Sequence, residues 1–380
     1  MQMNKLVIVL IALTLALSAC GGPTPTKGEV IVYVAAPLSG FQANGGQTVL
    51  GGARLAADEV NKSGGLMGYK VVVVAKDDES DDDVAVAVAQ DIAADLKAGK
   101  RVLGVIGHYN SGQTLAAMEV YKDLPIVIIT PTSSEATLTQ KGYRNFFRVN
   151  ANDLTQARVD AEYLVNNPKI GAKKIAIVHN DDPYGIGLGK LMADQLGKLG
   201  AQVAVKLQVQ VEQSKYITQV QQIKSAAPDA IFYAGYEVET PYLRKQLVDA
   251  GVKVPFMATD GAFLSATIDE AEGAAEGIYL SNFAPEPRAV VQANWIKAYQ
   301  DVEFRNPDTY SINGYSAMKV LIEGAKKAGT LDGPRVADAV RALDLTTPMG
   351  KVSYDASGDL RDQRVFIFQV KDGAFVQVGP

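Results

Sequence analysis

Short runs of β-branched residues alternate with longer amphipathic stretches along most of the chain. In the first part, this pattern predicts strands at Val30–Ala35, Val71–Lys76, Val102–Ile106 and Ile126–Ile129. The stretches between them predict helices at Leu50–Lys62, Val84–Lys97 and Thr114–Lys122. Strands that alternate with helices of this length indicate βαβ units and a parallel sheet.

The same rhythm restarts after Ala151 with a predicted helix, Asp153–Val165, that has its own N-cap. Strands are predicted at Lys174–Val178, Val203–Val209, Ala230–Tyr233 and Phe256–Thr259. Helices are predicted at Leu188–Leu199, Ile217–Ala226 and Pro241–Ala250. Two successive α/β halves predict two doubly wound lobes.

The last hundred residues are less regular. The predicted helices are Val290–Val302, Ile312–Ala328 and Arg335–Leu343, and the predicted strands are Val352–Tyr354, Val365–Val370 and Phe375–Val378. From this pattern alone, we expect each lobe to be one continuous half of the chain.

The N-terminus has the pattern of an export signal. Lys5 precedes an apolar run, Leu6–Leu13, that is too short to remain as a transmembrane helix, which needs about 20 residues. The run Leu17–Cys20 resembles the lipobox of bacterial lipoproteins. We therefore expect residues 1–19 to be a signal peptide, Cys20 to be lipidated and residues 20–28 to form a flexible tether. The alternative is a plain secretory signal with a cysteine near its cleavage site by chance.

Composition and charge narrow the classes of partner. The chain has a formal net charge of −5, which argues against nucleic acid or anionic lipid as a partner. Cys20 is the only cysteine, so the mature chain has no disulfide, no cysteine-based zinc site and no cysteine nucleophile.

Polar residues that follow the predicted strands are the candidates for ligand binding, because ligands bind at the carboxyl ends of parallel strands. Ser111 and Ser134 lie before or near helices, where a hydroxyl and free backbone N–H groups suit a carboxylate. The alternative is that both serines only cap helices. Asp260, beside Gly261, could bind an ammonium group, although an Asp-Gly pair is also typical of a turn.

Three tyrosines could form walls of such a site. Tyr184 and Tyr236 follow predicted strands, and Tyr315 lies in a late helix. A tyrosine packs against an apolar side chain and still offers a hydroxyl, although any one of the three could be ordinary packing.

Other motifs give no reason to expect a metal, a cofactor or catalysis. His108 and His179 lack neighbours at ligand spacing. Residues 185–190 fail both phosphate-loop patterns, and no nucleophile motif occurs. The acidic run Asp77–Asp83 lacks the glycine and final glutamate of an EF-hand loop, so we interpret it as a solvated loop that enters a helix.

Several short motifs, taken in order, resemble one protein family. They are Ala36-Pro37-Leu38-Ser39-Gly40, Val105-Ile106-Gly107-His108 with Ser111, Ile129-Thr130-Pro131, Val178-His179 with Tyr184-Gly185, and Tyr233-Ala234-Gly235-Tyr236. The chain resembles the leucine/isoleucine/valine-type periplasmic binding proteins of ABC importers. The resemblance implies two α/β lobes joined by three crossovers. Lobe 1 would comprise residues 29–152 plus 284–345, and lobe 2 residues 153–283 plus 346–380.

The resemblance also implies roles for the candidate residues. Ser111, Thr132 and Ser134 would hold the α-carboxylate and ammonium of an amino acid, Thr132 largely through its backbone. Asp260 would neutralise the ammonium. Tyrosines would line or close the pocket, namely Tyr184, Tyr236 and Tyr315.

Three departures from the family pattern concern specificity and bonding. Asp260 stands where leucine-type members carry a glutamate, and Gly45 stands where they carry an aromatic wall. These changes are compatible with an amino acid as the ligand, but they argue against leucine, isoleucine or valine as that amino acid. The disulfide of enteric members is also missing around Asn110.

From these observations we expect a monomeric, lipid-anchored, extracytoplasmic protein that binds a branched-chain or related amino acid between its lobes and delivers it to an ABC permease, without an enzymatic step. One alternative is a sensor of the same fold for an amino acid, amide or urea-like compound. Others are a binder of an amine-free aromatic carboxylate and, more remotely, an exported nucleotide-sugar or dinucleotide enzyme.

Overall fold

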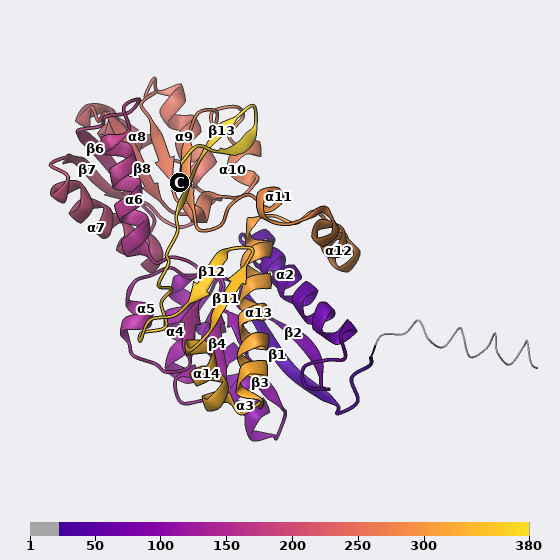
Figure 1. The fold of residues 1–380 in the computed structure, drawn as a ribbon. Coiled ribbons are helices and arrows are strands. Elements are labelled where there is room, and N and C mark those ends of the chain that lie inside the picture. Colours follow the sequence, from indigo (N-terminus) through magenta and orange to yellow (C-terminus); the bar gives the residue numbers. More distant parts are fainter. Residues whose placement is uncertain (1–22, 380) are drawn as a thin grey trace, which may run out of the picture.

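Two lobes, each built around its own sheet, make up the described part of the chain. The computed structural model describes residues 23–379. Figure 1 shows the lobes one above the other, with the first strands in the lower lobe. The signal peptide and Cys20 lie outside the described residues. Within residues 23–379, no helix is both long and apolar enough to cross a membrane.

The first lobe contains a five-stranded parallel sheet in the order β2-β1-β3-β4-β5. Its strands are β1 (Glu29–Ala36), β2 (Lys70–Asp77), β3 (Val102–Gly107), β4 (Val127–Thr130) and β5 (Phe146–Arg148). Every residue of β3 and β4 is buried, which is typical of parallel strands covered on both faces. Because β3 and β4 are parallel neighbours, the loops that follow them meet at one edge of the sheet.

The second lobe contains a seven-stranded sheet in the order β14-β13-β10-β9-β8-β6-β7. The parallel strands are β6 (Lys174–His179), β7 (Gln202–Gln208), β8 (Ala230–Ala234), β9 (Phe256–Ala258) and β10 (Tyr279–Asn282). Two antiparallel strands complete the sheet, β13 (Phe366–Lys371) and β14 (Ala374–Gln377). A separate hairpin comprises β11 (Asp344–Thr347) and β12 (Gly350–Ser353).

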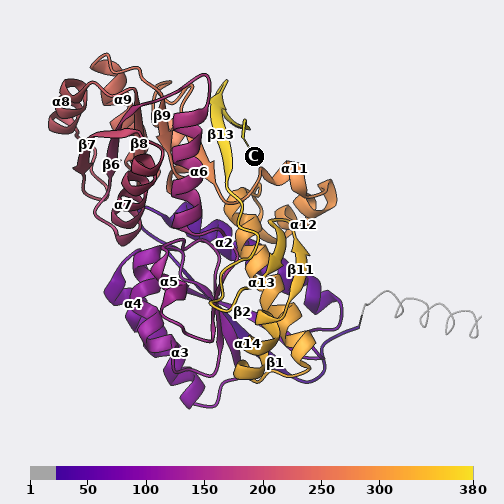
Figure 2. The ribbon, with the colours of Figure 1, turned by 60° about the vertical axis from the view of Figure 1, so that its left-hand side comes forward.

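Helices cover both faces of each sheet (Figures 1 and 2). In the first lobe they are α2 (Ala43–Lys62), α3 (Asp82–Lys97), α4 (Ser111–Tyr121), α5 (Thr137–Gln140), α13 (Thr309–Ala328) and α14 (Gly333–Arg341). In the second lobe they are α6 (Asp153–Asn166), α7 (Pro183–Lys198), α8 (Ile217–Ala226), α9 (Thr240–Asp249), the short 3-10 helix η1 (Asp260–Ala262) and α10 (Ala266–Asp269). Two more helices precede α13, namely α11 (Pro287–Val290) and α12 (Ala293–Glu303).

Successive residues of one strand pack into different apolar cores. In β1, Val32 and Val34 belong to the core that includes α2 and α13, whereas Tyr33 and Ala35 belong to the core on the other side with α3 and α4. This alternation is the period of two that a strand imposes on its side chains. It explains why each lobe needs helices on both faces of its sheet.

Two glycines allow α2 and α13 to pack closely. A Cβ atom on Gly52 of α2 would lie 1.9 Å from the carbonyl oxygen of Ser311, and one on Gly314 of α13 would lie 2.0 Å from that of Val49. Because both distances are far below van der Waals contact, any larger residue at either position would push the helices apart.

The late helices return to the first lobe, so the lobes are not continuous halves of the chain. Buried residues of α13 and α14 belong to the core of the first sheet, which contradicts what the pattern alone predicted. The last segment then crosses again to β13, as the yellow chain in Figures 1 and 2 shows. Three crossovers therefore join the lobes, in agreement with the predicted fold class.

The lobe boundaries themselves stay a prediction. Val352, Tyr354 and Leu360 pack into the core of the first sheet, although the predicted boundary assigns them to lobe 2. We propose that the third crossover lies nearer to residues 361–365 than to residues 345–346.

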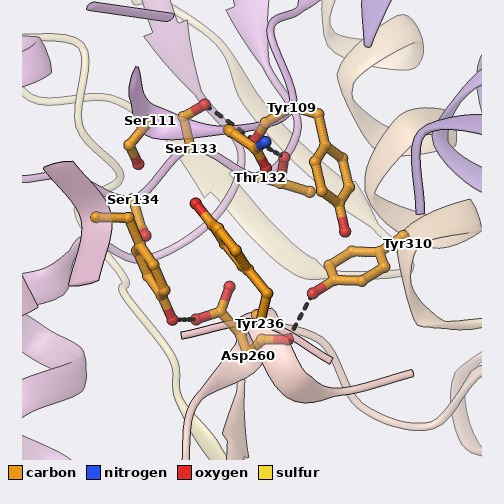
Figure 3. A pocket seen from close by; sticks show the side chains of 11 residues that line it. Tyr109, Ser111, Thr132, Ser133, Ser134, Tyr236, Asp260 and Tyr310 are labelled. Atoms are coloured by element: carbon orange, nitrogen blue, oxygen red, sulfur yellow. Dashed lines mark hydrogen bonds between the residues drawn. The ribbon is translucent and has the colours of Figure 1, made fainter. Parts of the chain in front are cut away.

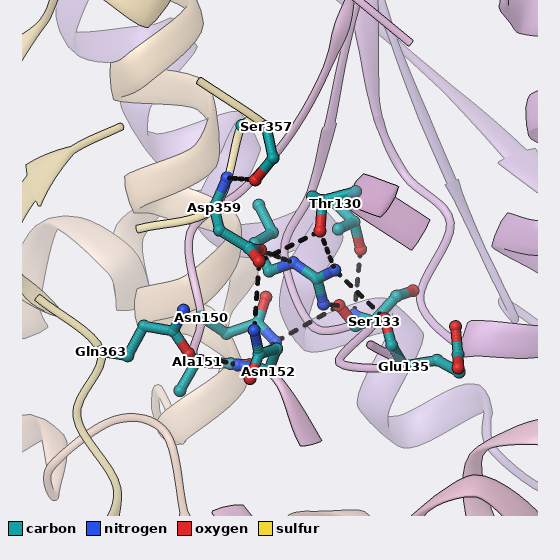
Figure 4. A network of polar contacts seen from close by, with 12 residues as sticks. Thr130, Ser133, Glu135, Asn150, Ala151, Asn152, Ser357, Asp359 and Gln363 are labelled. Atoms are coloured by element: carbon teal, nitrogen blue, oxygen red, sulfur yellow. Dashed lines mark hydrogen bonds and ion pairs between the residues drawn. The ribbon is translucent and has the colours of Figure 1, made fainter. Parts of the chain in front are cut away.

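Polar side chains tie the first and third crossovers together (Figure 4). The buried Arg148 forms an ion pair with Asp359, at 2.6 Å between Nε and Oδ1. Asn152 donates its side-chain N–H to Asp359 Oδ2 at 3.1 Å, and its backbone N–H to Gln363 Oε1 at 3.0 Å. The segments that connect the lobes are thus bonded to each other.

Every predicted strand and helix overlaps an observed one. The pattern missed short elements such as β5, β10 and β11, which are three or four residues long. The acidic run was also interpreted wrongly in part, because Asp78 is fully buried. Asp81, in contrast, caps α3 by accepting hydrogen bonds from the backbone N–H groups of Asp83 and Val84, in agreement with a loop that enters a helix.

Candidate functional site

A small cavity lies where the two lobes face each other (Figure 3). The first lobe supplies the loops after β3 and β4 and the start of α13. The second lobe supplies residues that follow β6, β8 and β9. The residues that line the cavity are Tyr109, Asn110, Ser111, Thr132, Ser133, Ser134, Tyr184, Tyr236, Asp260, Gly261 and Tyr310. Six of the seven predicted site residues are brought together here, and Tyr315 is not.

The first wall of the cavity begins at the N-terminus of α4. Ser111 is the first residue of this helix, and its hydroxyl accepts a hydrogen bond from the backbone N–H of Glu135 at 3.2 Å. That bond links the loop after β3 to the loop after β4. The Ser111 hydroxyl keeps its proton for a ligand at the positive end of the helix dipole.

The turn after β4 is held by its own hydroxyl groups. Ser133 donates its backbone N–H to Thr130 Oγ1 at 3.0 Å and its hydroxyl to the carbonyl of His108 at 3.0 Å. Thr132 donates its hydroxyl to the carbonyl of Tyr109. The Thr132 side chain therefore has no proton left for a ligand, which agrees with a role mainly through its backbone.

The second wall carries a buried carboxylate. Asp260 Oδ1 accepts hydrogen bonds from Tyr184 Oη and from Gln156 Nε2, both at 2.8 Å. The other carboxylate oxygen points into the cavity (Figure 3). The two bonds therefore hold Asp260 in place while one oxygen stays available to a ligand.

The electrostatic character of this wall is negative. Burial raises the pKa of Asp260 to about 6, although the hydrogen bonds from Gln156 and Tyr184 oppose the rise. Burial raises the pKa of the neighbouring Asp153 to about 8, so this carboxyl is mostly neutral at pH 7 and the negative charge of the wall comes from Asp260. No lysine or arginine is among the residues that line the cavity. A cationic group in the cavity would therefore stabilise the ionised form of Asp260.

Two tyrosine rings stack beside Asp260. The rings of Tyr184 and Tyr236 lie 5.7 Å apart at an angle of 11°. A Cβ on Gly261 would lie 2.9 Å from Cδ1 of Tyr236, so only glycine leaves room for this ring. The hydroxyl of Tyr236 is buried and has no hydrogen-bond partner among the described residues. Burial is the main cause that raises the pKa of Tyr236, and the nearby Asp182 raises this pKa further. Figure 3 shows this hydroxyl directed towards the first wall.

Tyr315 lies away from the cavity, contrary to the expectation. Its hydroxyl donates to Glu59 at 2.8 Å, and its ring packs edge-on against Trp295. Tyr310 lines the cavity instead, and its hydroxyl donates to the backbone carbonyl of Asp260 at 2.6 Å. The predicted helix began at Ile312, whereas Asp308 caps a helix that begins at Thr309. The Asp308 cap was the signal that could have placed Tyr310 at the helix end near the cleft.

Tyr109 is a second lining residue that the sequence reasoning missed. The expected open space at Gly45 is filled by this side chain, because a Cβ on Gly45 would lie only 2.3 Å from Tyr109 Oη. Gly45 therefore does not enlarge the cavity. It makes room for a tyrosine from another loop.

His108 has a carboxylate neighbour that its sequence position did not reveal. Its Nδ1 lies 2.6 Å from Asp78 Oδ2, and its Nε2 lies 3.1 Å from Tyr121 Oη. The pair is buried behind the cavity wall and supports the loop after β3. In residues 23–379, no three histidine, cysteine or acidic side chains are grouped in a way that could hold a metal ion.

The comparison with known proteins gives the class. Residues 32–374 match the model of a family described as periplasmic binding protein, and the chain belongs to this family. It is 32% identical over 348 residues to the Leu/Ile/Val-binding protein homolog 1 of Brucella abortus, with 91% of each chain covered. It is 30% identical to an amino acid binding protein of Pseudomonas aeruginosa, with 95% of each chain covered. Membership confirms the predicted family and implies an extracytoplasmic solute-binding protein.

Solved structures support the fold. A leucine binding protein from Thermotoga maritima superimposes with a TM-score of 0.84 at 24% identity, covering 92% of this chain and 98% of that one. A solute binding protein from Rhodopseudomonas palustris, solved with benzoate, superimposes with a TM-score of 0.80 at 19% identity, covering 93% and 96%. At these identities the likeness extends to the fold alone. It confirms the predicted two-lobe α/β class.

Proposed function

We propose that this protein is a lipid-anchored, monomeric solute-binding protein that captures an amino acid between its lobes and delivers it to an ABC permease. The relatives at 30–32% identity are named for binding amino acids, which supports the ligand class. No step of this function changes a covalent bond of the ligand.

The observation that carries the proposal is the pairing of two unlike walls across one cavity. The buried carboxylate of Asp260 suits an ammonium group, and the hydroxyl of Ser111 at a helix N-terminus suits a carboxylate. An amino acid carries these two groups on one carbon atom. A ligand with only one of them would leave one wall without its partner.

Binding has to be coupled to movement of the lobes. The cavity has a volume of about 20 Å³, which is room for about one water molecule. An amino acid reaches this site only if the lobes move apart and then close on it. Because the ligand touches both walls only when the lobes are closed, it shifts the equilibrium towards the closed form. We infer that the permease recognises this form.

Each hydrogen bond to a charged group contributes about 1.5–3 kcal/mol. Two or three of them, with burial against the tyrosine rings and less the cost of closure, are enough for a micromolar dissociation constant, about −8 kcal/mol.

Calorimetry on the mature chain tests the ligand class. The ligands are free amino acids, the same compounds as amides that lack the carboxylate, and carboxylic acids that lack the amine. We expect binding only by compounds that carry both groups. Binding by aromatic acids without an amine, and not by amino acids, would replace the proposal with a carboxylate binder.

Membrane attachment and transport need separate tests. We expect the Cys20→Ala variant to leave the membrane fraction and appear in the soluble extracytoplasmic fraction. Loss of uptake of the labelled ligand in cells without this protein would support transport. Unchanged uptake together with a lost response to the ligand would indicate a sensor instead.

A further inference from the structure

A buried acid lies behind the second wall of the cavity, where it cannot touch a ligand. Asp160 belongs to α6, and its side chain is fully buried. Its Oδ2 accepts a hydrogen bond from the Ser281 hydroxyl at 2.9 Å, whereas its Oδ1 has no hydrogen-bond partner among the described residues. A buried polar group with incomplete hydrogen bonding is unfavourable, and an apolar side chain would fill this position with less loss of stability. The carboxyl group at position 160 therefore points to a role beyond packing.

Hydrogen bonds connect Asp160 to the carboxylate that faces the cavity. Gln156 lies one turn before Asp160 on α6, and Ser281 belongs to β10. The Gln156 Nε2 atom donates one hydrogen bond to Ser281 Oγ at 2.9 Å and another to Asp260 Oδ1 at 2.8 Å. All four side chains are buried. A continuous chain of polar groups thus runs from Asp160 through Ser281 and Gln156 to Asp260.

The direction of donation along this chain is fixed. The Ser281 hydroxyl has a single proton, and it donates this proton to Asp160 Oδ2. The Ser281 oxygen can therefore only accept a hydrogen bond from Gln156, and only the NH2 end of the amide can donate one. The other N–H of the same NH2 group is then directed at Asp260 Oδ1. Asp160 thus decides which end of the Gln156 amide faces Asp260.

The opposite orientation of the amide would have a chemical consequence. Without an acceptor at position 160, the Ser281 proton is free to turn towards Gln156, and the amide can then present its oxygen. An amide oxygen cannot bond to an ionised Asp260, because both groups only accept. It can accept a hydrogen bond from a protonated Asp260. The reversed amide therefore favours the neutral form of Asp260, which offers no charge to an ammonium group.

We propose that Asp160 is a positioning residue for ligand binding, which acts through Ser281 to orient the Gln156 amide and so keeps Asp260 ionised for the ammonium of the ligand. Position 160 has to supply a hydrogen-bond acceptor and not a charge. This inference rests on the proposed function for the role of the ammonium. The orientation of the amide, in contrast, is a property of the unliganded protein.

The charges around Asp260 agree with this role. Burial raises the pKa of Asp160 well above its usual value, so its neutral form is favoured, and one oxygen of a neutral carboxyl group still accepts. The titratable groups near Asp260 lie on several elements, namely Asp153 and Asp160 on α6, Tyr184 on α7, Tyr236 after β8 and Tyr310 on α13. Burial raises the pKa values of the three tyrosines well above their usual range. Between about pH 5 and pH 8, only the acids among these groups therefore change charge.

The titration of Asp260 in the unliganded mature protein tests the inference directly. Carboxyl ¹³C NMR of aspartate-labelled protein follows this titration, and the Asp260→Asn variant identifies the signal. Asp160→Leu removes the acceptor. Asp160→Asn is the matched variant, because its amide oxygen can still accept from Ser281. We expect the Asp260 midpoint in Asp160→Leu to lie about one pH unit above that in Asp160→Asn, since a hydrogen bond to a charged group is lost.

Two further variants separate orientation from stability. Ser281→Ala breaks the same chain with a smaller change of volume, and it should also raise the Asp260 midpoint. It decides the question if Asp160→Leu does not fold. Asn145→Leu is the structural control, because this side chain donates to the carbonyls of Tyr121 and Ile126 at the opposite end of β4 from the cavity. It should lower the melting temperature and leave the midpoint unchanged.

The pH dependence of ligand affinity gives a second readout. Calorimetry tests the free amino acids one at a time. An amino acid that binds the original protein should bind Asp160→Leu about fivefold more weakly than Asp160→Asn at pH 6, and almost equally at pH 8, where Asp260 is ionised in both variants. A loss of affinity of the same size at both pH values would show a structural role only and would overturn the inference.

The outcomes for the inference and for the proposed function are distinct. Equal Asp260 midpoints in folded Asp160→Leu and Asp160→Asn would overturn the inference, and amino acid binding by the original protein would still support the proposed function. If the midpoints differ as expected but the original protein binds no amino acid, the orientation of the amide is supported and the proposed function is wrong.

Discussion

The two walls of the cavity differ in hydrogen bonding and in charge. On the first wall, the hydroxyls of Thr132 and Ser133 are bonded to backbone carbonyls of the neighbouring loop after β3, and no charged side chain lines the surface. On the second wall, the carboxylate of Asp260 is buried, and only neutral groups donate to it. The first wall is rigid and neutral, and the second is charged and short of a counter-charge.

This difference indicates how ligand binding and closure are coupled. A rigid wall of hydroxyl and N–H groups orients the ligand carboxylate, and little conformational entropy is lost because the wall is already ordered. A buried carboxylate without a cation is unfavourable until an ammonium arrives. The largest share of the ligand's preference for the closed form should therefore come from the second wall.

Removing the charge of the second wall should have the largest effect. Asp260→Asn keeps the shape and an acceptor oxygen but loses the charge that meets the ammonium. We expect amino acid affinity to fall by about 100-fold, since a hydrogen bond to a charged group contributes about 1.5–3 kcal/mol and the ammonium would be buried without a counter-charge. Calorimetry measures the amino acid affinity of the variant and of the original protein. Affinity within threefold of the original would show that the walls do not differ in this way.

Removing a hydroxyl from the first wall should have a smaller effect. We expect Ser111→Ala and Ser134→Ala each to weaken amino acid binding by about tenfold, which corresponds to about one hydrogen bond. Ser133→Ala is the matched control, because its hydroxyl is bonded to the carbonyls of His108 and Tyr109. It should lower the melting temperature more than it lowers affinity. An equal loss of affinity in all three variants would contradict the distinction between hydroxyls that bind the ligand and a hydroxyl that only stabilises the loop.

Acidification should affect ligand binding and unliganded stability in opposite directions. Burial raises the pKa of Asp260 to about 6 and that of Glu237 to about 8. A carboxyl group whose pKa is higher in the folded state than in the unfolded state binds a proton on folding. The free energy of unfolding of the unliganded protein should therefore rise as the pH falls from about 8 towards 5. Ligand affinity should fall over the lower part of this range, because Asp260 loses its charge. Melting curves with and without ligand measure both trends. A ligand-induced shift that grows below pH 6 would contradict the role of Asp260.

The smallest effect is expected outside the walls. Tyr315→Phe removes a hydroxyl that is bonded to Glu59 rather than directed into the cavity. We expect affinity to stay within twofold and the free energy of unfolding to fall by about 1 kcal/mol or less. Tyr310→Phe is the comparison on the same helix and should lower affinity. A tenfold loss of affinity in Tyr315→Phe would show that Tyr315 contributes to the binding site.

Much of the site could be predicted because its residues follow strands. Ser111, Thr132 and Ser134 come directly after strands of one parallel sheet, and parallel strands end at one edge. Tyr109 and Tyr310 could not be placed in this way. Whether their side chains meet depends on how α2 and α13 pack on the sheet, and Gly45 decides it from a distant part of the chain.

The sequence by itself determined the α/β class, the parallel strands and most element positions, because strand and helix periods are local properties of the chain. It also determined which chemical groups stand at the strand ends. The tertiary structure alone decided that the late helices return to the first lobe, that Asp78 pairs with His108, and that Tyr310 rather than Tyr315 reaches the cavity. Each of these depends on contacts between residues far apart in the chain, and a local pattern carries no information about which distant surfaces meet.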